Sequence, residues 1–238
     1  SPYIDMARVL GGREKIVSTS ADNDFKMKAQ DLEAAITDRT RWLVLNSPSN
    51  PSGSVYSASE LAELADVLEK HPHVWLLSDD IYEHILFRGQ FTTMAKVRPF
   101  MANRTLTVNG VSKAYCMTGW RIGYAGGPNQ LIKAMRTVQS QVTTCPPSVT
   151  QAAAVAALDG PEDVLAKIRS VFLERRNMVV SGLNSVPGID CPTPQGAFYA
   201  FPSCERLLGR KTETQTIANE QDFARYLLDA ANVMVVPG

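Results

Sequence analysis

The amino-acid sequence predicts an α/β protein with a mainly parallel central sheet, followed by part of a smaller α+β domain. Short apolar, β-branched runs alternate with longer helical patterns in the first part of the chain, which is typical of strand–helix–strand units around a parallel sheet. After Gly160-Pro161 this alternation gives way to one long helical pattern and scattered short apolar runs. We therefore expect a large domain over residues 1–160 and a small C-terminal domain over residues 161–238, both of them incomplete.

The first predicted elements form one strand–helix–strand unit. Trp42 to Leu45 and Val74 to Leu77 are short apolar runs that predict buried strands. Residues 59–68, between them, carry leucine and alanine at helical spacing, and Ser57 or Ser59 can cap the helix at its N-terminus. The sequence thus predicts two strands of one sheet joined by a helix.

The remaining predicted elements follow in order. Thr105 to Val108 predicts a third strand, and Arg121 to Ala125 a fourth that ends in the turn Gly126-Gly127-Pro128. Helices are predicted at 130–141, 148–158 and 162–183, the last opening after Pro161, which suits a first helical turn. Beyond these, the sequence predicts short strands at Ala197 to Phe201 and Val233 to Val236, with a helix near residues 221–231 between them.

Composition and the chain ends limit the classes of protein to consider. Twenty-four basic residues balance twenty-four acidic ones in 238, so no net charge favours a nucleic acid or a membrane surface as partner. The four cysteines form no CxxC pair and the chain has three histidines, so we expect neither a metal site nor a disulfide framework. The chain opens at Ser1 without a signal-like segment and stops just after an expected strand, so we expect a cytoplasmic protein of which this is a fragment.

Polar residues with chemical potential follow the first two predicted strands. Residues 46–53, Asn-Ser-Pro-Ser-Asn-Pro-Ser-Gly, follow the first strand and predict a rigid turn that can aim the amide of Asn50 at a ligand. Asp79 follows the second strand, where a carboxylate is costly to leave unpaired, so we expect it to face a cation or a protonated heterocycle. In isolation, the first feature is more typical of a simple turn, and the second is equally typical of a structural ion pair.

The third predicted strand leads into the segment with the strongest chemical pattern. Lys113 lies in an apolar, glycine-rich stretch, where desolvation favours the neutral amine that a Schiff base requires. Arg121 lies between Trp120 and Ile122, and we expect its guanidinium to meet a buried anion such as a phosphate. Residues 194–199, Pro-Gln-Gly-Ala-Phe-Tyr, predict a turn into an aromatic strand that could wall a pocket, although as an isolated feature it is more typical of core packing.

Taken together, these segments resemble the class I/II aminotransferases of the fold-type I pyridoxal-phosphate (PLP) enzymes, within them the aspartate aminotransferase-like branch. Residues 48–53 resemble the family turn NPxNPTG with Ser52 in place of threonine, and residues 78–83, Ser-Asp-Asp-Ile-Tyr-Glu, resemble SDEIYE. Ser112-Lys113 through Arg121 resembles SKxxxMTGWRIGY, the most specific of the three motifs. The resemblance extends through almost the whole chain and implies the three-layer PLP-dependent transferase fold.

The resemblance also implies a cofactor and a role for each matching residue. Lys113 would form the Schiff base with pyridoxal 5'-phosphate and shuttle the substrate α-proton. Asp79 would hold the pyridine nitrogen protonated, and Tyr82 and Asn50 would contact the phenolic oxygen of the cofactor. Ser112 and Arg121 would bind its phosphate. The implied reaction transfers an amino group between an aspartate-like or similar amino acid and a 2-oxo acid, in a homodimer.

Other functions remain open at the level of the sequence. Lys113, Asp79 and Tyr82 would serve a PLP-dependent β-elimination lyase, for example one that cleaves C–S bonds, equally well, because fold and cofactor do not fix the reaction. A PLP-binding sensor domain of a transcription regulator would keep the same lysine. A dinucleotide dehydrogenase is disfavoured, since no G-x-G-x-x-G follows a strand. The arginine that binds the substrate α-carboxylate and the N-terminal phosphate-binding segment of the family have no counterpart in this sequence.

Overall fold

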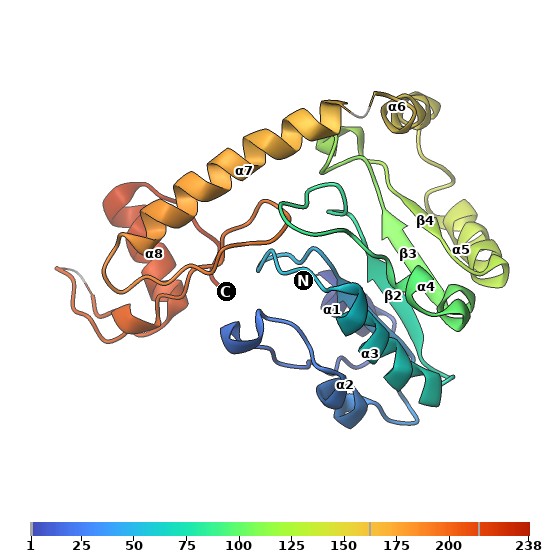
Figure 1. Ribbon diagram of the computed structural model, residues 1–238, viewed down its shortest axis with the longest axis horizontal. Coiled ribbons are helices and arrows are strands. Elements are labelled where there is room, and N and C mark those ends of the chain that lie inside the picture. The colour runs from blue at the N-terminus through green and yellow to red at the C-terminus, as the bar shows by residue number, and fades with distance from the viewer. Residues whose placement is uncertain (1, 162, 214) are drawn as a thin grey trace.

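The computed structural model describes residues 2–161, 163–213 and 215–238. The α-helices are α1 (Pro2–Val9), α2 (Ala29–Ala35), α3 (Ala58–Lys70), α4 (Met94–Val97), α5 (Asn129–Val142), α6 (Ser148–Leu158), α7 (Asp163–Asn184) and α8 (Glu220–Ala231). The strands are β1 (Trp42–Asn46), β2 (Trp75–Asp79), β3 (Thr105–Asn109) and β4 (Tyr124–Gly126). Short 3-10 helices occupy η1 (Ala21–Asn23), η2 (Pro99–Asn103), η3 (Thr118–Trp120) and η4 (Glu205–Leu207). Figure 1 shows their arrangement.

The four strands form one sheet in the order β1-β2-β3-β4. The pairs β1–β2 and β2–β3 are parallel, whereas β4 runs antiparallel to β3. Asn46 is in register with Asp79, and Asp79 with Val108, so the carboxyl ends of the three parallel strands meet at one edge. The prediction of a mainly parallel sheet is confirmed, and that edge is where parallel α/β sheets carry ligands.

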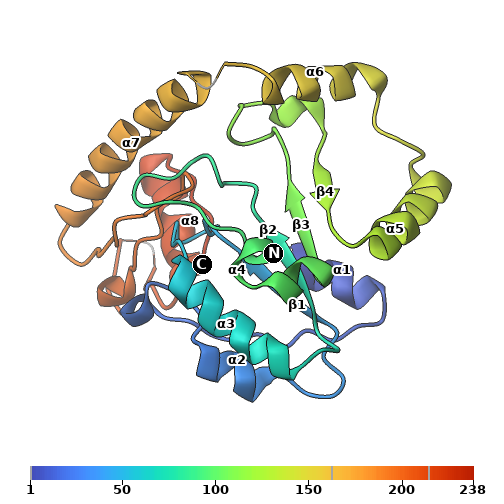
Figure 2. The same cartoon turned by 45° about the vertical axis from the view of Figure 1, so that its right-hand side comes forward.

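Helix α3 links β1 to β2 and forms as the sequence predicts. Ser57 is its N-cap: the side chain accepts a hydrogen bond from the Glu60 amide at 3.2 Å, and the Glu60 carboxylate accepts one from the Ser57 amide at 2.7 Å. This reciprocal capping box satisfies two amides that a helix start otherwise leaves unpaired. The helix lies between α2 and α4 in both views of the molecule (Figures 1 and 2).

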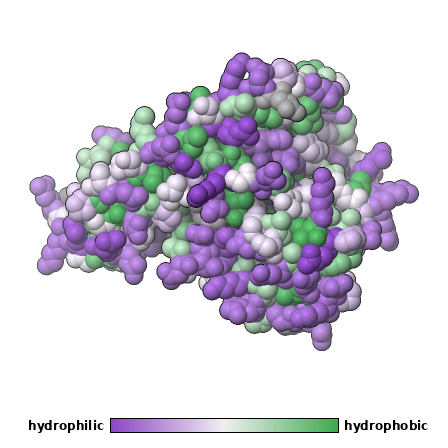
Figure 3. Space-filling view, in the orientation of Figure 1, coloured by the Kyte–Doolittle hydropathy of each residue, from purple (hydrophilic) through white to green (hydrophobic). Residues whose placement is uncertain are grey.

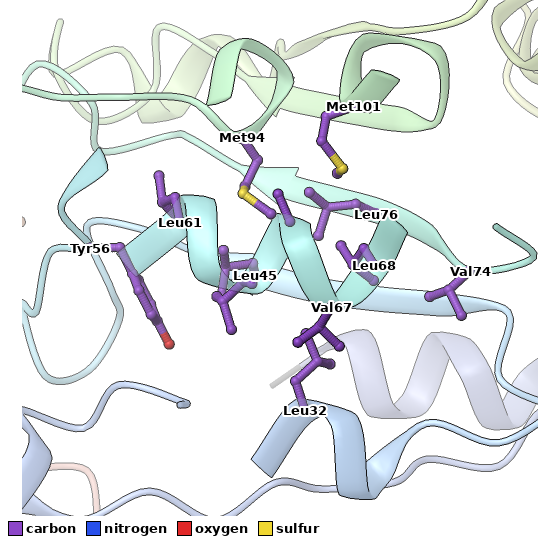
Figure 4. Close-up of a cluster of buried hydrophobic side chains, with 12 residues drawn as sticks. Leu32, Leu45, Tyr56, Leu61, Val67, Leu68, Val74, Leu76, Met94 and Met101 are labelled. Carbon is purple, nitrogen blue, oxygen red and sulfur yellow. The ribbon is translucent and has the colours of Figure 1, made fainter. Parts of the chain in front are cut away.

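The main hydrophobic core lies where α3 meets the sheet (Figure 4). Leu61, Leu64 and Leu68 of α3 are at most 2% exposed, and they pack with Leu76 of β2 and Met101 of η2. Burying one such side chain contributes about 1.5–3 kcal/mol relative to leaving it exposed. This core fixes the position of β1 and β2 and therefore of the residues that follow them.

Helix α7 connects the sheet-bearing part of the chain to the segments around α8, as both views show (Figures 1 and 2). It extends over residues 163–184, close to the predicted 162–183, and the predicted first residue, Glu162, lies outside the described residues. Leu165 and Phe172 on this helix pack against a second buried cluster formed by Tyr82, Ile85, Ala114 and Ala197. The second cluster joins three segments that are far apart in the sequence.

Three predicted strands are wrong in whole or in part. The fourth strand begins at Tyr124 rather than Arg121, because Arg121 ends η3 in the left-handed conformation, with a φ of 51° that cannot extend a strand. Residues 197–201 and 233–236 form no strand in the described chain, since a strand needs a hydrogen-bonded neighbour along its length. Near the first of them only isolated bridges form, Leu86 with Gly196 and Asp190 with Ser203.

Candidate active site

The site begins with the asparagine that ends β1. The Asn46 side chain donates a hydrogen bond to the Asp79 carbonyl at 2.9 Å and accepts one from the backbone amide of Asn50 at 2.8 Å. One amide side chain therefore ties the end of β2 to the turn after β1. The side chain of Asn50 is in turn hydrogen-bonded to the Tyr82 phenol.

The turn over residues 47–54 is locked against the turn over residues 194–197. The Gly53 carbonyl accepts hydrogen bonds from the Gln195 and Gly196 amides, both at 2.9 Å. Gly53 has a φ of +68°, and a Cβ placed on it would lie 2.5 Å from Cβ of Pro194. Only glycine meets both the backbone angle and the close approach. The two turns thus form one rigid unit, although about 140 residues of chain separate them.

Asp79, at the end of β2, is half-buried and has hydrogen-bond donors but no cation. Its carboxylate accepts hydrogen bonds from the Tyr3 hydroxyl at 2.6 Å and the Ile81 amide at 3.3 Å. No ion pair of the described residues includes it. Burial, and then the hydrogen bond to Asp79, raise the pKa of Tyr3, so the phenol stays protonated and donates.

Asp80 is more deeply buried than Asp79. It is 3% exposed and accepts a hydrogen bond from the Ser78 hydroxyl at 2.6 Å. Burial raises the pKa of Asp80 to about 6, because the low-dielectric surroundings disfavour the charged carboxylate more than the hydrogen bond favours it. Of the two adjacent acids, Asp79 is the more accessible to a ligand.

Tyr82 is buried in a cluster of aromatic rings. It is 3% exposed, and its ring makes edge contacts with Phe198 and Tyr199 at centroid distances of 5.5 and 5.6 Å. The hydroxyl oxygens of Tyr82 and Tyr199 lie 2.5 Å apart. Burial first, and then this hydrogen bond, raise the pKa of Tyr82, so the phenol is a hydrogen-bond donor at all ordinary pH values.

Lys113 follows β3 in a loop whose backbone is held by its neighbours. Val111 is fully buried and Ala114 is 2% exposed, whereas Lys113 itself is half-buried. Its Nζ lies 5.9 Å from the centroid of the Phe198 ring, and no ion pair of the described residues includes it. A half-buried amine with no carboxylate partner is uncommon and is available for chemistry.

The surroundings of Arg121 differ from the prediction. The sequence predicts a buried anion beside Arg121, but the side chain is exposed, and its Nη1 donates to the Thr118 carbonyl at 2.9 Å. Because η3 ends in a left-handed residue, the arginine turns outward before β4 begins. The residue after Arg121 nevertheless packs against the loop that holds Lys113, because a Cβ built on Gly110 would lie only 3.2 Å from the Ile122 carbonyl oxygen. Ser112 is half-buried beside Lys113.

The structure therefore brings Asn50, Asp79, Tyr82 and Lys113 to one edge of the sheet, with Arg121 nearby on the surface. Sequence reasoning missed Tyr3, because nothing links it to Asp79 76 positions away. It favoured core packing over a pocket wall for Phe198 and Tyr199, whereas both lie beside predicted site residues. A separate hollow of about 570 Å³ between residues 83–91 and Arg169 contains none of the four.

Comparison with known proteins decides the family. The family model for aminotransferase class I and II matches residues 1–238. The chain belongs to the class I and II aminotransferases. Members of this family depend on PLP, which agrees with an amine and a carboxylate at one sheet edge that form no ion pair within the described chain.

The individual relatives of this chain are also named aminotransferases. It is 55% identical to the aspartate aminotransferase of Rhizobium meliloti (strain 1021), covering 99% of the chain and 58% of that protein. It is 50% identical to the aspartate/prephenate aminotransferase of Cereibacter sphaeroides, of which it covers 60%. The chain thus spans about three fifths of the length of these relatives.

Solved structures confirm the fold. The crystal structure of the Rhizobium meliloti aspartate aminotransferase superimposes with a TM-score of 0.96 at 54% identity, over 99% of this chain and 59% of the other. An aspartate aminotransferase of Thermus thermophilus with maleate gives 0.89 at 38%, over 99% of this chain and 58% of the other. An aromatic aminotransferase of Pyrococcus horikoshii gives 0.89 at 33%, over 99% and 61%. The PLP-dependent transferase fold is therefore established for this aminotransferase-family chain.

In the described residues, no helix combines the length and apolar character needed to cross a membrane.

Proposed function

We propose that this chain carries the cofactor-binding centre of a PLP-dependent aminotransferase that exchanges an amino group between an amino acid and a 2-oxo acid. The observation that carries the proposal is the Lys113 amine and the Asp79 carboxylate at the carboxyl edge of the sheet, neither of which forms an ion pair with another described residue. A half-buried amine and a half-buried carboxylate that form no ion pair with each other favour the binding of a ligand that contacts both.

The donor set fits PLP group by group. The aldehyde of PLP needs an amine, its ring nitrogen a carboxylate and its phenolic oxygen a hydrogen-bond donor. Lys113, Asp79 and Tyr82 provide these three, and Asn50 is hydrogen-bonded to Tyr82. The phosphate would take Ser112 and Arg121, of which Arg121 is exposed and would have to turn its guanidinium toward Lys113.

When bound, PLP supplies an aldehyde and an electron-withdrawing ring that stabilises negative charge at the substrate Cα. Residues of this chain would move the proton and hold the cofactor in place. Lys113 Nζ would take the proton from that carbon and deliver it to the carbon that was the cofactor aldehyde, which is general base and then acid catalysis by one amine. Asp79, oriented by the Tyr3 hydroxyl, holds a proton on the ring nitrogen, and Tyr82 donates to the phenolic oxygen. Phe198, 5.9 Å from Nζ, shields the amine from water on one side.

We propose aspartate as one amino donor. Relatives at 50–55% identity are named aspartate or aspartate/prephenate aminotransferases, and a solved relative contains maleate, a dicarboxylate. The aromatic aminotransferase of Pyrococcus horikoshii, at 33% identity, makes aromatic amino acids the second class to test.

The test is an exchange assay with the cofactor-loaded protein. Aspartate and 2-oxoglutarate should yield glutamate and oxaloacetate in equal amounts. Failure of this exchange, with release of pyruvate, ammonia and a thiol from an S-substituted cysteine, would instead indicate a β-elimination lyase. Lys113→Ala should abolish exchange. The matched control is Lys133→Ala, which removes an exposed lysine from α5 and should leave exchange unchanged.

We also propose that the protein is a homodimer. Large apolar side chains are exposed on α5 and α6, among them Val138, Val142, Val149 and Val155, each more than half exposed. Figure 3 shows hydrophobic residues in several patches on one face of the molecule. Exposed apolar surface of this kind favours burial by further protein. Light scattering coupled to size-exclusion chromatography should give twice the mass of one chain.

A further inference from the structure

The Tyr82 hydroxyl has two neighbours that can each donate a hydrogen bond to it. The Tyr199 hydroxyl lies 2.5 Å away, and the Asn50 side chain is bonded to the same phenol. A phenol has one hydrogen to donate and an oxygen that accepts. In this structure the bond to Tyr199 raises the pKa of Tyr82, which is expected when Tyr82 is the donor. When an acceptor in the pocket takes the Tyr82 hydrogen instead, the Tyr82 oxygen is left to accept hydrogen bonds from Tyr199 and Asn50.

The position of Tyr199 is set by the backbone rather than by the hydroxyl contact. Ala197 is fully buried with a φ of 58°, and its amide donates to the Ile85 carbonyl at 2.8 Å. Gly196 packs so closely on Pro48 that a Cβ would lie 2.8 Å from the proline ring. The ring of Phe198 stacks on Phe172 of α7 at 5.3 Å. Residues 196–199 are therefore held independently on three sides, which keeps the Tyr199 hydroxyl beside the Tyr82 oxygen whichever of the two donates.

We propose that Tyr199 is a positioning residue that acts through Tyr82: its hydroxyl donates to the Tyr82 oxygen and so directs and strengthens the hydrogen bond that Tyr82 gives to the bound cofactor. A donor that itself accepts a hydrogen bond is a stronger donor, because the two bonds polarise each other. This inference rests on the proposed function, since the acceptor is the phenolic oxygen of PLP.

The readout is the pH titration of the visible absorbance of the cofactor-loaded protein, which follows the proton on the cofactor-linked nitrogen of Lys113. Tyr82 stabilises negative charge on the phenolic oxygen, which favours loss of that proton. Weakening Tyr82 therefore raises the titration midpoint. Tyr199→Phe should raise it by about 0.5–1 pH unit, the equivalent of one net hydrogen bond.

A double-mutant cycle separates action through Tyr82 from a direct effect. Tyr82→Phe should raise the midpoint more than Tyr199→Phe does, and adding Tyr199→Phe to Tyr82→Phe should change nothing further. The matched control is Tyr226→Phe on α8, where the midpoint should stay at the wild-type value. Urea unfolding of each variant shows whether a shift comes from general loosening of the fold, which would alter Tyr226→Phe and Tyr199→Phe alike.

The outcomes distinguish the two proposals. If wild-type protein binds PLP but Tyr199→Phe leaves the midpoint unchanged, or shifts it equally with and without Tyr82, the role of Tyr199 is overturned while the proposed function stands. If the wild-type protein shows no visible absorbance that changes with pH, the proposed function fails, and the inference fails with it.

Discussion

Replacing Gly53 by alanine tests the claim that two remote turns form one rigid unit at the site. The substitution forces a side chain into a backbone with a φ of +68°, which costs about 1–2 kcal/mol for a residue other than glycine. The new Cβ would also lie 2.5 Å from Cβ of Pro194 and 2.7 Å from the Gly196 carbonyl oxygen. These are a proline ring and a backbone atom, which cannot move aside cheaply, so overlap adds about 1–3 kcal/mol.

Gly89→Ala is the control that isolates the overlap. Gly89 has a similar φ of +80°, but nothing lies within 4 Å of its built Cβ. Urea unfolding of the cofactor-free proteins should show Gly53→Ala destabilised by about 2–5 kcal/mol and Gly89→Ala by about 1–2 kcal/mol. Cofactor affinity should fall only in Gly53→Ala, because Asn50 belongs to the displaced turn. Equal loss of stability in the two variants would refute the close contact between the turns.

Three further perturbations test the core and the two acids. Leu64→Ala, at a side chain 1% exposed, should lower the free energy of unfolding by about 2–5 kcal/mol, and a loss below about 1 kcal/mol in urea unfolding would contradict the packing of α3. The pKa of Asp80 is about 6 in the folded protein, against 3.8 for an ordinary aspartate, so the folded protein keeps a proton that the unfolded chain releases between these values. Stability should therefore fall by up to about 3 kcal/mol as pH rises from about 4 to 6, then level off, and Asp80→Asn should flatten this dependence in unfolding curves measured across that range. Tyr3→Phe removes the hydroxyl that orients Asp79, and PLP titration of the cofactor-free protein should show about tenfold weaker binding, whereas affinity within twofold of wild type would argue against the contact.

The sequence predicted those parts of the fold that depend on local patterns. Ser57 and Glu60 form the capping box that begins α3, and the apolar runs at β1 and β2 form adjacent strands of the sheet against which that helix packs. The polar residues after those strands then meet at one edge because parallel strands in register end together.

The parts that the sequence did not predict depend on tertiary contacts. Arg121 turns outward because η3 ends in a left-handed residue, a backbone choice that an arginine rarely makes and that no local pattern indicates. The composition of residues 197–201 predicts a strand, but the Ala197 amide bonds to the Ile85 carbonyl and no ladder follows. The hydrogen bond from Tyr3 to Asp79 and the one between Tyr82 and Tyr199 span 76 and 117 residues.

Borohydride reduction followed by peptide mapping tests the identity of the cofactor lysine most directly. Reduction fixes PLP to whichever amine holds it, so mass spectrometry of the digested protein should find the added mass on the peptide that contains Lys113 and on no other. Lys113→Ala should carry no adduct under the same conditions. An adduct on a different lysine of the wild-type protein, or none at all in protein saturated with PLP, would contradict the assignment.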